Sequence, residues 1–293
     1  MANLKEIRQR IASVQTTRQV TSAMKMVSAA KLRKAQDAVI KIRPFANKLT
    51  EILSSLSESL GDSGDFAFAK SHGNGDKLLI VAINSNRGLC GTFNTNVNKQ
   101  LVQMVGEAKT EGFTNIDVLA IGKNVNEFAE RNAMQVSEQN ELYNTLDFEH
   151  ISPIMEQIML DFVEGTYDKV LVVYNAFKNT STQVVTVEQL LPIAMQDNQA
   201  QQQSSVATNY IFEPSQDSLV EHILPMSLKM QLYKALLNSY AAEHAARMTA
   251  MHKATDNATE LLRTLNLQYN KARQAAITNE ITEIVGGADA LKE

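Results

Sequence analysis

Tryptophan is absent from this chain of 293 residues, cysteine occurs once, and aromatic residues make up only 6% of the sequence. The single cysteine, Cys90, excludes an internal disulfide and fits a reducing compartment. The five histidines show no spacing typical of a metal site, and no cofactor-binding motif is complete, so we expect neither a metal nor a cofactor. The low aromatic content suits long thin helices better than a thick globular core.

The sequence also lacks long apolar runs. Its N-terminal region carries Lys5, Glu6, Arg8, Arg10 and Arg18 in place of the apolar stretch of a secretory signal. No stretch approaches the roughly 18 uninterrupted apolar residues that a membrane-spanning helix needs. We therefore expect a protein that is soluble, or that is attached to a membrane only through a partner.

What the sequence does contain is a strong charge asymmetry. Residues 1–43 hold ten basic and two acidic side chains, so this segment carries a charge of +8 and the rest of the chain carries -12. Three interpretations are open: a solvated helix face, a nucleic-acid contact, or a contact with an acidic protein. No aromatic residue interrupts the basic segment to stack on bases, so an acidic protein partner is favoured over nucleic acid.

Apolar residues repeat every seven positions at both ends of the chain, a pattern typical of helices that pack along a narrow seam. The C-terminal seam includes His244, a polar residue that we expect to fix the register. The two ends are therefore predicted to wind together into a rod. The predicted C-terminal seam is Leu237, Ala241, His244, Met248, Met251, Thr255, Ala258, Leu262, Leu265, Tyr269, Ala272 and Ala276, and the N-terminal seam is Leu4, Ile7, Ile11, Val14, Val20, Met24, Val27, Leu32, Ala35, Val39 and Ile42.

Between the ends, short apolar strands alternate with helical segments, an order that predicts an α/β domain with a mostly parallel, Rossmann-like sheet. We assign residues 1–60 and 218–293 to the terminal helices and residues 76–213 to this central domain. The expected strands are Leu78–Asn84, Ile116–Ile121, Lys169–Tyr174, an added antiparallel strand Gln183–Leu190 and an edge strand Tyr210–Glu213, and the expected helices are Thr92–Lys109, Asn124–Asn132 and Ile151–Glu164.

Local residues set the expected limits of the long helices. Pro44 is expected to interrupt the first helix, and Pro225 to kink or split the last one. Ser218, with Glu221 three residues later, matches a capping box at the start of the last helix. The glycine pair 286–287 allows that helix to end or fray after about residue 285.

The turn Gly88-Leu89-Cys90-Gly91 follows a predicted strand and precedes a predicted helix, which is where phosphate-binding loops occur in α/β folds. It matches neither the dinucleotide fingerprint nor the P-loop, so a tight turn that needs glycine is favoured over a nucleotide site. Cys90 is interpreted as a small packing residue and not as a nucleophile. No catalytic residue is predicted.

The C-terminal helix stays apolar beyond its last predicted seam residue, Ala276. Its later apolar positions include Ile277, Ile281, Ile284 and Val285. Apolar residues without a helix partner call for a covering surface, and we favour a surface supplied by another protein over simple fraying.

Three parts of the chain resemble the gamma subunit family of F-type ATP synthases. Residues 7–14, Thr17 and residues 21–27 resemble its N-terminal signature, and Gly88–Gly91 resembles its central motif. The segments that resemble its C-terminal signature are residues 243–251, 257–258, 270–278 and 280–288. They occur in the right order and at the right distances, so the resemblance is specific.

The resemblance implies that the terminal helices form a long antiparallel two-helix coiled coil, which turns as a shaft inside a hexamer of alpha and beta subunits. The central domain would lie at its foot, against the epsilon subunit and the membrane ring of c subunits. Ion flow through that ring would drive ATP synthesis on the beta subunits, on the cytoplasmic face of a bacterial inner membrane. By the same resemblance, the residues that bind the alpha and beta subunits are Arg8, Met24, Arg273, Gln274, Thr278, Ile281 and Val285.

Two other functions remain open. A static coiled-coil tether with a globular head explains the seam, but it does not explain the match to the family's motifs. A nucleotide-dependent enzyme would act at the Gly88 turn, which lacks a phosphate-binding motif. Co-purification with catalytic subunits distinguishes these functions from a shaft.

Overall fold

The computed structural model describes residues 4–60, 68, 75–143, 146–193 and 216–290. The chain divides into two compact units. Residues 1–29 and 247–293 form one, called the coil unit below, and residues 30–246 form the other, the sheet unit. Helices α1 (Leu4–Leu60) and α5 (Gln216–Ala290) contribute residues to both units. The predicted strand Tyr210–Glu213 lies outside the described residues.

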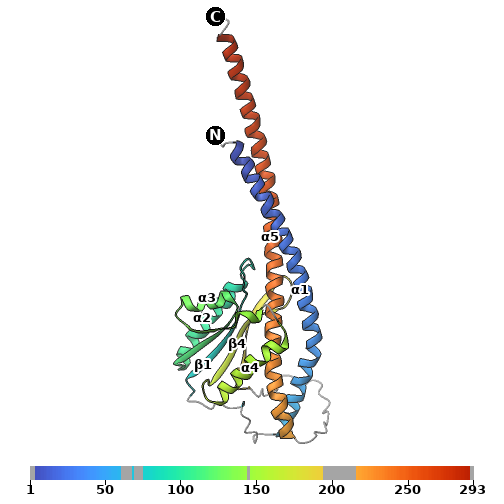
Figure 1. Ribbon diagram of the computed structural model, residues 1–293, viewed down its shortest axis with the longest axis vertical. Coiled ribbons are helices and arrows are strands. Elements are labelled where there is room, and N and C mark those ends of the chain that lie inside the picture. The colour runs from blue at the N-terminus through green and yellow to red at the C-terminus, as the bar shows by residue number, and fades with distance from the viewer. Residues whose placement is uncertain (1–3, 61–67, 69–74, 144–145, 194–215, 291–293) are drawn as a thin grey trace. The chain divides into compact units, whose positions relative to one another are not determined.

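The described strands of the sheet unit form one sheet in the order β3-β2-β1-β4-β5 (Figure 1). β1 (Lys77–Ile83) pairs in parallel with β2 (Asn115–Ile121) and with β4 (Lys169–Phe177), and β2 pairs in parallel with β3 (Gln135–Glu138). β5 (Gln183–Leu191) runs antiparallel to β4. These pairings confirm the predicted α/β class, its parallel strands and the added antiparallel strand.

Helices cover both faces of the sheet. α2 (Phe93–Glu111) and α3 (Lys123–Arg131) pack on one face, and α4 (Phe148–Val163) packs on the other together with part of α5. Side chains alternate across a strand, so Ile80 of β1 joins the α2 and α3 core while Val81 joins the α4 and α5 core. The central strands are therefore buried on both sides, as their continuous apolar sequences predict.

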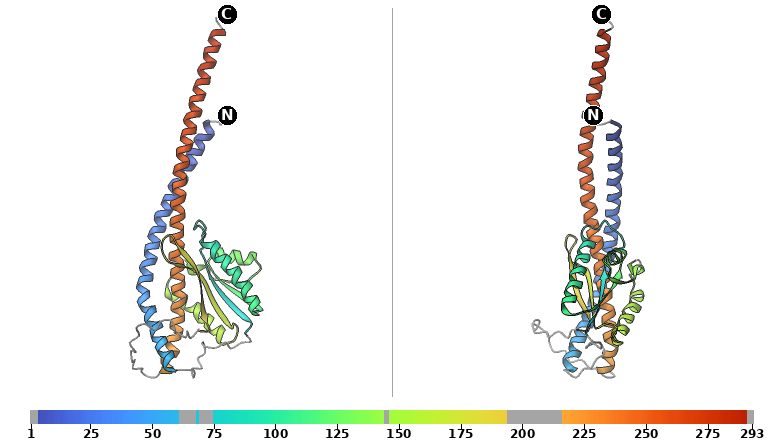
Figure 2. Two further views of the ribbon diagram at one scale, coloured as in Figure 1. Left: turned by 180° about the vertical axis from the view of Figure 1, so that it is seen from behind. Right: turned by 90° about the vertical axis from the view of Figure 1, so that its left-hand side faces the viewer.

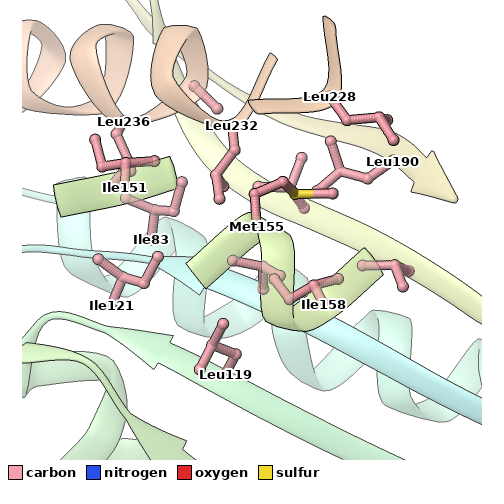
Figure 3. Close-up of a cluster of buried hydrophobic side chains, with 14 of the residues drawn as sticks. Ile83, Leu119, Ile121, Ile151, Met155, Ile158, Leu190, Leu228, Leu232 and Leu236 are labelled. Carbon is pink, nitrogen blue, oxygen red and sulfur yellow. The ribbon is translucent and has the colours of Figure 1, made fainter. Parts of the chain in front are cut away.

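α5 completes the second of these cores. Leu228, Leu232 and Leu236 are spaced by four residues, lie on one face of α5, and are at most 2% exposed. They cluster with Ile151 and Met155 of α4 over the sheet (Figure 3). Burial of each such side chain contributes about 1.5–3 kcal/mol. The core of the sheet unit thus includes a segment that the sequence analysis assigns to the C-terminal coiled-coil helix.

The prolines do not interrupt the long helices. α1 continues through Pro44, and α5 continues through Pro225, so the predicted interruption at Pro44 and the predicted split at Pro225 are wrong, while a kink at Pro225 stays a prediction. A proline inside a helix removes one backbone hydrogen bond, and the turns on either side keep theirs. Within helices as long as these, that loss does not end the helix.

The ends of α5 also differ from the prediction. The helix begins at Gln216, which places Ser218 inside the first turn and makes the predicted cap wrong. It continues through Gly287 to Ala290, so the glycine pair does not end it. Glycine in a helix interior costs only about 1 kcal/mol relative to alanine, which a long helix tolerates.

Two short elements have no counterpart in the sequence analysis: β3 and a 3-10 helix, Asn140–Tyr143. β3 has four residues, of which only Val136 is apolar, so no alternating pattern marks it. A short polar strand at the edge of a sheet is a usual means of avoiding further strand pairing.

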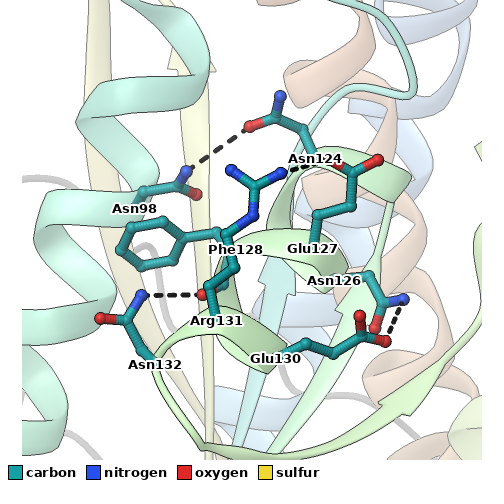
Figure 4. A network of polar contacts seen from close by, with 8 residues as sticks. All are labelled: Asn98, Asn124, Asn126, Glu127, Phe128, Glu130, Arg131 and Asn132. Carbon is teal, nitrogen blue, oxygen red and sulfur yellow. Dashed lines mark hydrogen bonds and ion pairs between the residues drawn. The ribbon is translucent and has the colours of Figure 1, made fainter.

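Amide side chains tie α3 to its neighbours (Figure 4). Asn126 Nδ2 donates to Glu130 Oε1 and to Glu138 Oε2, each at 3.1 Å, and Glu138 belongs to β3. Asn98 Nδ2 of α2 donates to Asn124 Oδ1 at 3.5 Å. These bonds join α2, α3 and β3 to one another, so the polar cluster has a structural role.

In the coil unit, α1 and α5 lie side by side and run in opposite directions (Figure 2). Two cross-helix hydrogen bonds agree with this: Arg8 bonds to Tyr269 and Thr21 to Thr255, so residue numbers rise along α1 as they fall along α5. The predicted antiparallel pairing of the chain ends is confirmed. Over the described residues, no helix has an apolar stretch long enough to cross a membrane.

Candidate functional site

The seam of α5 in the coil unit follows the seven-residue repeat. Met251, Ala258, Leu262 and Leu265 are 5–8% exposed. Thr255, Tyr269 and Ala272 are half-buried, whereas Ala276 is exposed. The predicted seam is therefore confirmed up to Ala272 and is wrong at Ala276. Nearer the N-terminal end of α5, the predicted seam residues Leu237, Ala241 and His244 are buried within the sheet unit.

On α1 the seam departs from the prediction. Val20 and Val27 are 51% and 57% exposed, so they lie outside it. The side chains that are buried or half-buried at the strict repeat are Leu4, Ile7, Ile11, Val14, Arg18, Thr21, Lys25 and Ser28. The prediction followed the valines, but the helix keeps its spacing of three and four and places polar residues on the seam.

Two side-chain contacts join the helices across this seam. Thr255 Oγ1 donates to Thr21 Oγ1 at 2.9 Å, and Arg8 Nη2 donates to Tyr269 Oη at 2.8 Å. The Arg8 guanidinium also lies 5.7 Å from the centroid of the Tyr269 ring, a cation–π geometry. The hydrogen bond to Tyr269 raises the pKa of Arg8, which keeps its charge.

Sequence reasoning missed both contacts. A strict count of seven from Ile7 passes Val14 and reaches Thr21, so the repeat itself contains the signal for the threonine. The same steps in opposite directions from Thr21 and Thr255 place Leu4 opposite Ala272. Because α1 begins at Leu4, α5 continues beyond Ala272 without a partner from α1.

The flank of the coil unit is basic. Residues 1–29 and 247–273 together hold ten basic and three acidic side chains. A groove of about 610 Å³ runs beside the seam, and its described lining includes Arg18 and Arg263 with Ile11 and Leu262. No carboxylate is among its described lining residues. This combination of charge and apolar surface suits contact with an acidic protein surface.

The unpartnered end of α5 is exposed along its described length after Ala272, up to Val285. Arg273, Gln274 and Thr278 are exposed, and Thr278 Oγ1 donates to the Gln274 carbonyl at 2.9 Å. The apolar side chains of this end are also open: Ile277 is 48% exposed, Ile281 56%, Ile284 65% and Val285 53%. Their spacing of four, three and one gives the helix an apolar stripe that the described side chains of this chain leave open.

The glycine turn joins β1 to α2. Leu89 and Gly91 both have φ of +63°, the left-handed region that favours glycine. Cys90 between them is 2% exposed, and its Sγ lies 3.8 Å from Ser85 Oγ. Gly88 also belongs to the turn, but its φ lies outside the left-handed region. The turn therefore directs the cysteine into the protein and exposes Leu89, which is 65% exposed.

A place where an α/β fold could bind a ligand is filled by α5. Helices after β1 and β2 cover one face and the helix before β4 covers the other, so the winding reverses between β1 and β4. Ligands bind outside the carboxyl ends of the strands at such a point. Here Cys90 and Phe93 cluster with Ala242 and Ala246 of α5, and Phe177 at the end of β4 packs against them.

Two tyrosines of the sheet unit have raised pKa values, and each donates a hydrogen bond that links two segments of this unit. Tyr167 Oη donates to Asp117 Oδ2 at 3.0 Å, and burial followed by the Asp117 charge raises the pKa of Tyr167 to about 12. Tyr174 Oη donates to Glu188 Oε1 at 2.6 Å, and burial followed by that bond raises the pKa of Tyr174 above its ordinary value. Both phenols stay protonated at neutral pH and cannot act as bases. No group of three or more His, Cys, Asp or Glu side chains within the described residues is placed to hold a metal.

Comparison with known proteins finds similar proteins that match almost the whole chain. The model of the family described as ATP synthase matches residues 3–291. The ATP synthase gamma chain of Flavobacterium psychrophilum is 53% identical over 294 residues, which cover 100% of each chain. A chain of the Tetrahymena thermophila mitochondrial ATP synthase central stalk and c-ring is similar with a TM-score of 0.58 and 26% identity, over 80% of this chain and 99% of that one. A chain of the Euglena gracilis mitochondrial ATP synthase shares the fold, with a TM-score of 0.67 and 20% identity over 98% of this chain and 94% of that one.

Proposed function

The chain belongs to the ATP synthase gamma-chain family, and on this premise we propose that it is the central rotary shaft of an F-type ATP synthase. The shaft couples ion flow through the membrane c-ring to ATP synthesis or hydrolysis on the beta subunits. In physical terms, it links the binding free energies of distant sites through a rigid element that takes several discrete positions.

The unpartnered end of α5 is the observation that carries this proposal. Ile281, Ile284 and Val285 are more than half exposed on a helix that has no α1 partner beyond Ala272. An exposed apolar stripe of this kind indicates a surface that another protein covers. Apolar contact is non-directional, so a tip inside an apolar sleeve passes between rotational positions without breaking strong buried ion pairs.

The alpha and beta subunits form this sleeve. Arg273, Gln274 and Thr278 make polar contacts with an acidic catch region of beta, and all three side chains are exposed. Ile281 and Val285 contact the apolar sleeve. The excess of basic residues in the coil unit supports an acidic hexamer surface, because opposite charges favour the encounter and the orientation.

Toward the C-terminal side of the coil unit's part of α1, Met24 lies close to the moving lever region of beta. Met24 is half-buried, and Val20, Met26 and Val27 near it are each more than half exposed. Arg8 also belongs to the contact surface. Its bond to Tyr269 uses one of the five guanidinium N–H donors, and the others remain for a carboxylate of the hexamer.

The chain has no catalytic site of its own in this proposal. The packing of Ala242 and Ala246 of α5 against Cys90 supports this, because α5 occupies the position where a Rossmann fold holds a nucleotide. The sheet unit contacts the epsilon subunit and the c-ring at the foot of the shaft. The complex then holds the chain on the cytoplasmic face of a bacterial inner membrane, as a peripheral subunit.

Purification of the tagged chain with its partners tests the proposal. We expect alpha and beta subunits with ATPase activity to co-purify, and we expect the chain alone to bind no ATP in calorimetry. Purification of the chain without alpha and beta subunits would indicate a static tether and contradict the proposal. ATP binding by the chain alone would indicate a nucleotide-dependent enzyme and also contradict it.

A truncation after Ala276 tests the assignment of the tip. We expect ATP-driven ion pumping by the complex in vesicles to fall strongly, while the thermal unfolding of the sheet unit stays unchanged. The removed residues lie in the coil unit, and those of them that the structure describes up to Val285 are exposed. Equal losses of folding and pumping would contradict the assignment.

A further inference from the structure

The seam of the coil unit has an outer half and an inner half with different side chains. In the outer half, Ile7, Ile11 and Val14 of α1 run along the part of α5 that carries Leu262 and Leu265. In the inner half, α1 presents four consecutive polar seam residues. These are Arg18, Thr21, Lys25 and Ser28. The inner half therefore buries less apolar surface on the α1 side and gains less from the hydrophobic effect.

Thr21 and Thr255 meet in the middle of this inner half. Thr255 Oγ1 donates to Thr21 Oγ1 at 2.9 Å, and Thr21 Oγ1 donates to the Arg18 carbonyl at 3.1 Å. Thr255 Oγ1 also lies 2.8 Å from the Met251 carbonyl, where it can donate instead. Each hydroxyl has a single proton, so while Thr255 donates to Thr21, the pair ties the Thr255 side chain of α5 to the α1 backbone at Arg18.

We propose that Thr21 and Thr255 form a clasp that holds the inner half of the coil closed and fixes how each helix is rotated about its own axis. A polar pair at a seam position specifies pairing at some cost in apolar packing. Successive residues of an α-helix are about 100° apart around the axis, so a rotation by one residue removes the threonine from the seam. Its hydroxyl then keeps only its own backbone acceptor, and the bond between the helices is lost.

The clasp follows from contacts inside the coil unit and does not depend on the proposed rotary function. In a shaft, such a clasp would make the two helices rotate as one body. Four successive layers with a polar α1 residue bury little apolar surface and only weakly resist separate rotation of the two helices, whereas a bonded pair among them makes the helices rotate together. Thr21 and Thr255 are therefore positioning residues: they act on the coil and not on any reacting group.

A double-mutant cycle on the full-length chain tests the clasp by amide hydrogen exchange over residues 18–28 and 248–258. The variants are T21V, T255V and T21V/T255V, because valine keeps the branched shape and removes the hydroxyl. We expect each single variant to raise exchange roughly fivefold, the factor given by a hydrogen bond worth about 1 kcal/mol. The double variant should return toward wild type, because replacing both partners by apolar groups of the same shape is nearly neutral, whereas either single variant leaves one hydroxyl facing a methyl group.

Two control variants separate the clasp from a general effect of the substitutions. T21S/T255S keeps both hydroxyls and should exchange like wild type. T17V removes an exposed threonine hydroxyl that donates to the Ser13 carbonyl at 3.0 Å, off the seam, and should change little. Additive increases in the cycle, or single variants that exchange like wild type, would overturn the proposal.

Spin labels on the exposed positions 19 and 257 test the rotational part, in a chain whose Cys90 is replaced by alanine. We expect a narrow distribution of distances between the labels in wild type and in T21S/T255S. In T21V/T255V the distribution should broaden, although its hydrogen exchange is close to wild type. A distribution that stays narrow in T21V/T255V would overturn the claim that the threonines fix helix rotation.

Discussion

The sheet unit and the coil unit bury their apolar side chains to different extents. In the sheet unit, Ile80, Ile83 and Ile121 are 0% exposed, because helices cover both faces of the strands. In the coil unit, two helices can shield each other only along a line, and Val20 and Ile284 remain more than half exposed. The sheet unit contains its own core, whereas the coil unit leaves apolar surface for another protein to cover.

The largest expected effect is in the sheet-unit core. Leu232→Ala should lower the free energy of unfolding by about 2–5 kcal/mol, because it leaves a cavity between α4, α5 and the sheet. Chemical denaturation of the full chain measures this change. The matched variant Leu267→Ala removes a side chain of the coil unit that is 58% exposed, and it should change stability by no more than about 0.5 kcal/mol. Similar losses in both variants would contradict the difference between the units.

Close backbone packing in the sheet unit gives the next effect. Gly122 has φ of +115°, and a Cβ there would lie 2.2 Å from the Asn84 carbonyl oxygen. Gly122→Ala should therefore cost about 1–3 kcal/mol in thermal unfolding, from strain and overpacking together. Gly112→Ala is the control, because its φ of +102° is also left-handed but a Cβ would meet nothing within 4 Å. The Gly122 variant should be the less stable of the two, and the reverse order would contradict this account of the packing.

At the tip of the coil unit we expect a change in coupling without a change in stability. Ile281→Ser with Val285→Ser should alter the free energy of unfolding by less than about 0.5 kcal/mol, since both side chains are already more than half exposed. ATP-driven ion pumping by the assembled complex should decrease. Val102→Ser on α2, where the valine is 46% exposed, is a control that should leave pumping unchanged. Loss of pumping in the control alone would place the partner surface elsewhere.

The smallest effect concerns a surface ion pair of the sheet unit. Lys229 Nζ lies 2.5 Å from Glu156 Oε1, and this hydrogen bond lowers the pKa of Glu156. A carboxyl with a lowered pKa in the folded state adds stability above its unfolded pKa of about 4.3 and loses it as the pH falls. The difference in melting temperature between wild type and Glu156→Gln should be small at pH 7 and should vanish in acid and at high salt. A difference that grows in acid would contradict the sign.

Much of the fold was predictable because the strongest patterns in the sequence coincide with the most buried residues. The strands around Ile80, Val118 and Val172 each contain a run of apolar residues, and these three residues are fully buried inside the covered sheet. β3 was not predictable in this way, because a polar edge strand gains its place from pairing with β2 and not from its own pattern. The start of α5 was misplaced because Ser218 and Glu221 match a cap motif that a longer helix overrides.

The functional surface was less predictable. The repeat indicated a two-helix seam, but an interpretation guided by hydrophobicity chose Val20 and Val27, and the actual seam contains Thr21. Partner-binding roles for Arg273, Gln274 and Thr278 stay predictions, because the surface that they would contact belongs to other chains. The same holds for the domain limits 1–60, 76–213 and 218–293, since the compact units divide both long helices internally.

The most direct test is observation of rotation in a single complex. The alpha and beta hexamer is fixed to a surface, a bead is attached to an exposed residue of the sheet unit such as Lys109, and ATP is supplied. We expect the bead to turn in one direction, in steps that follow ATP hydrolysis. A chain that stays bound and stationary while the same complex hydrolyses ATP would contradict the central claim that it is a rotating shaft.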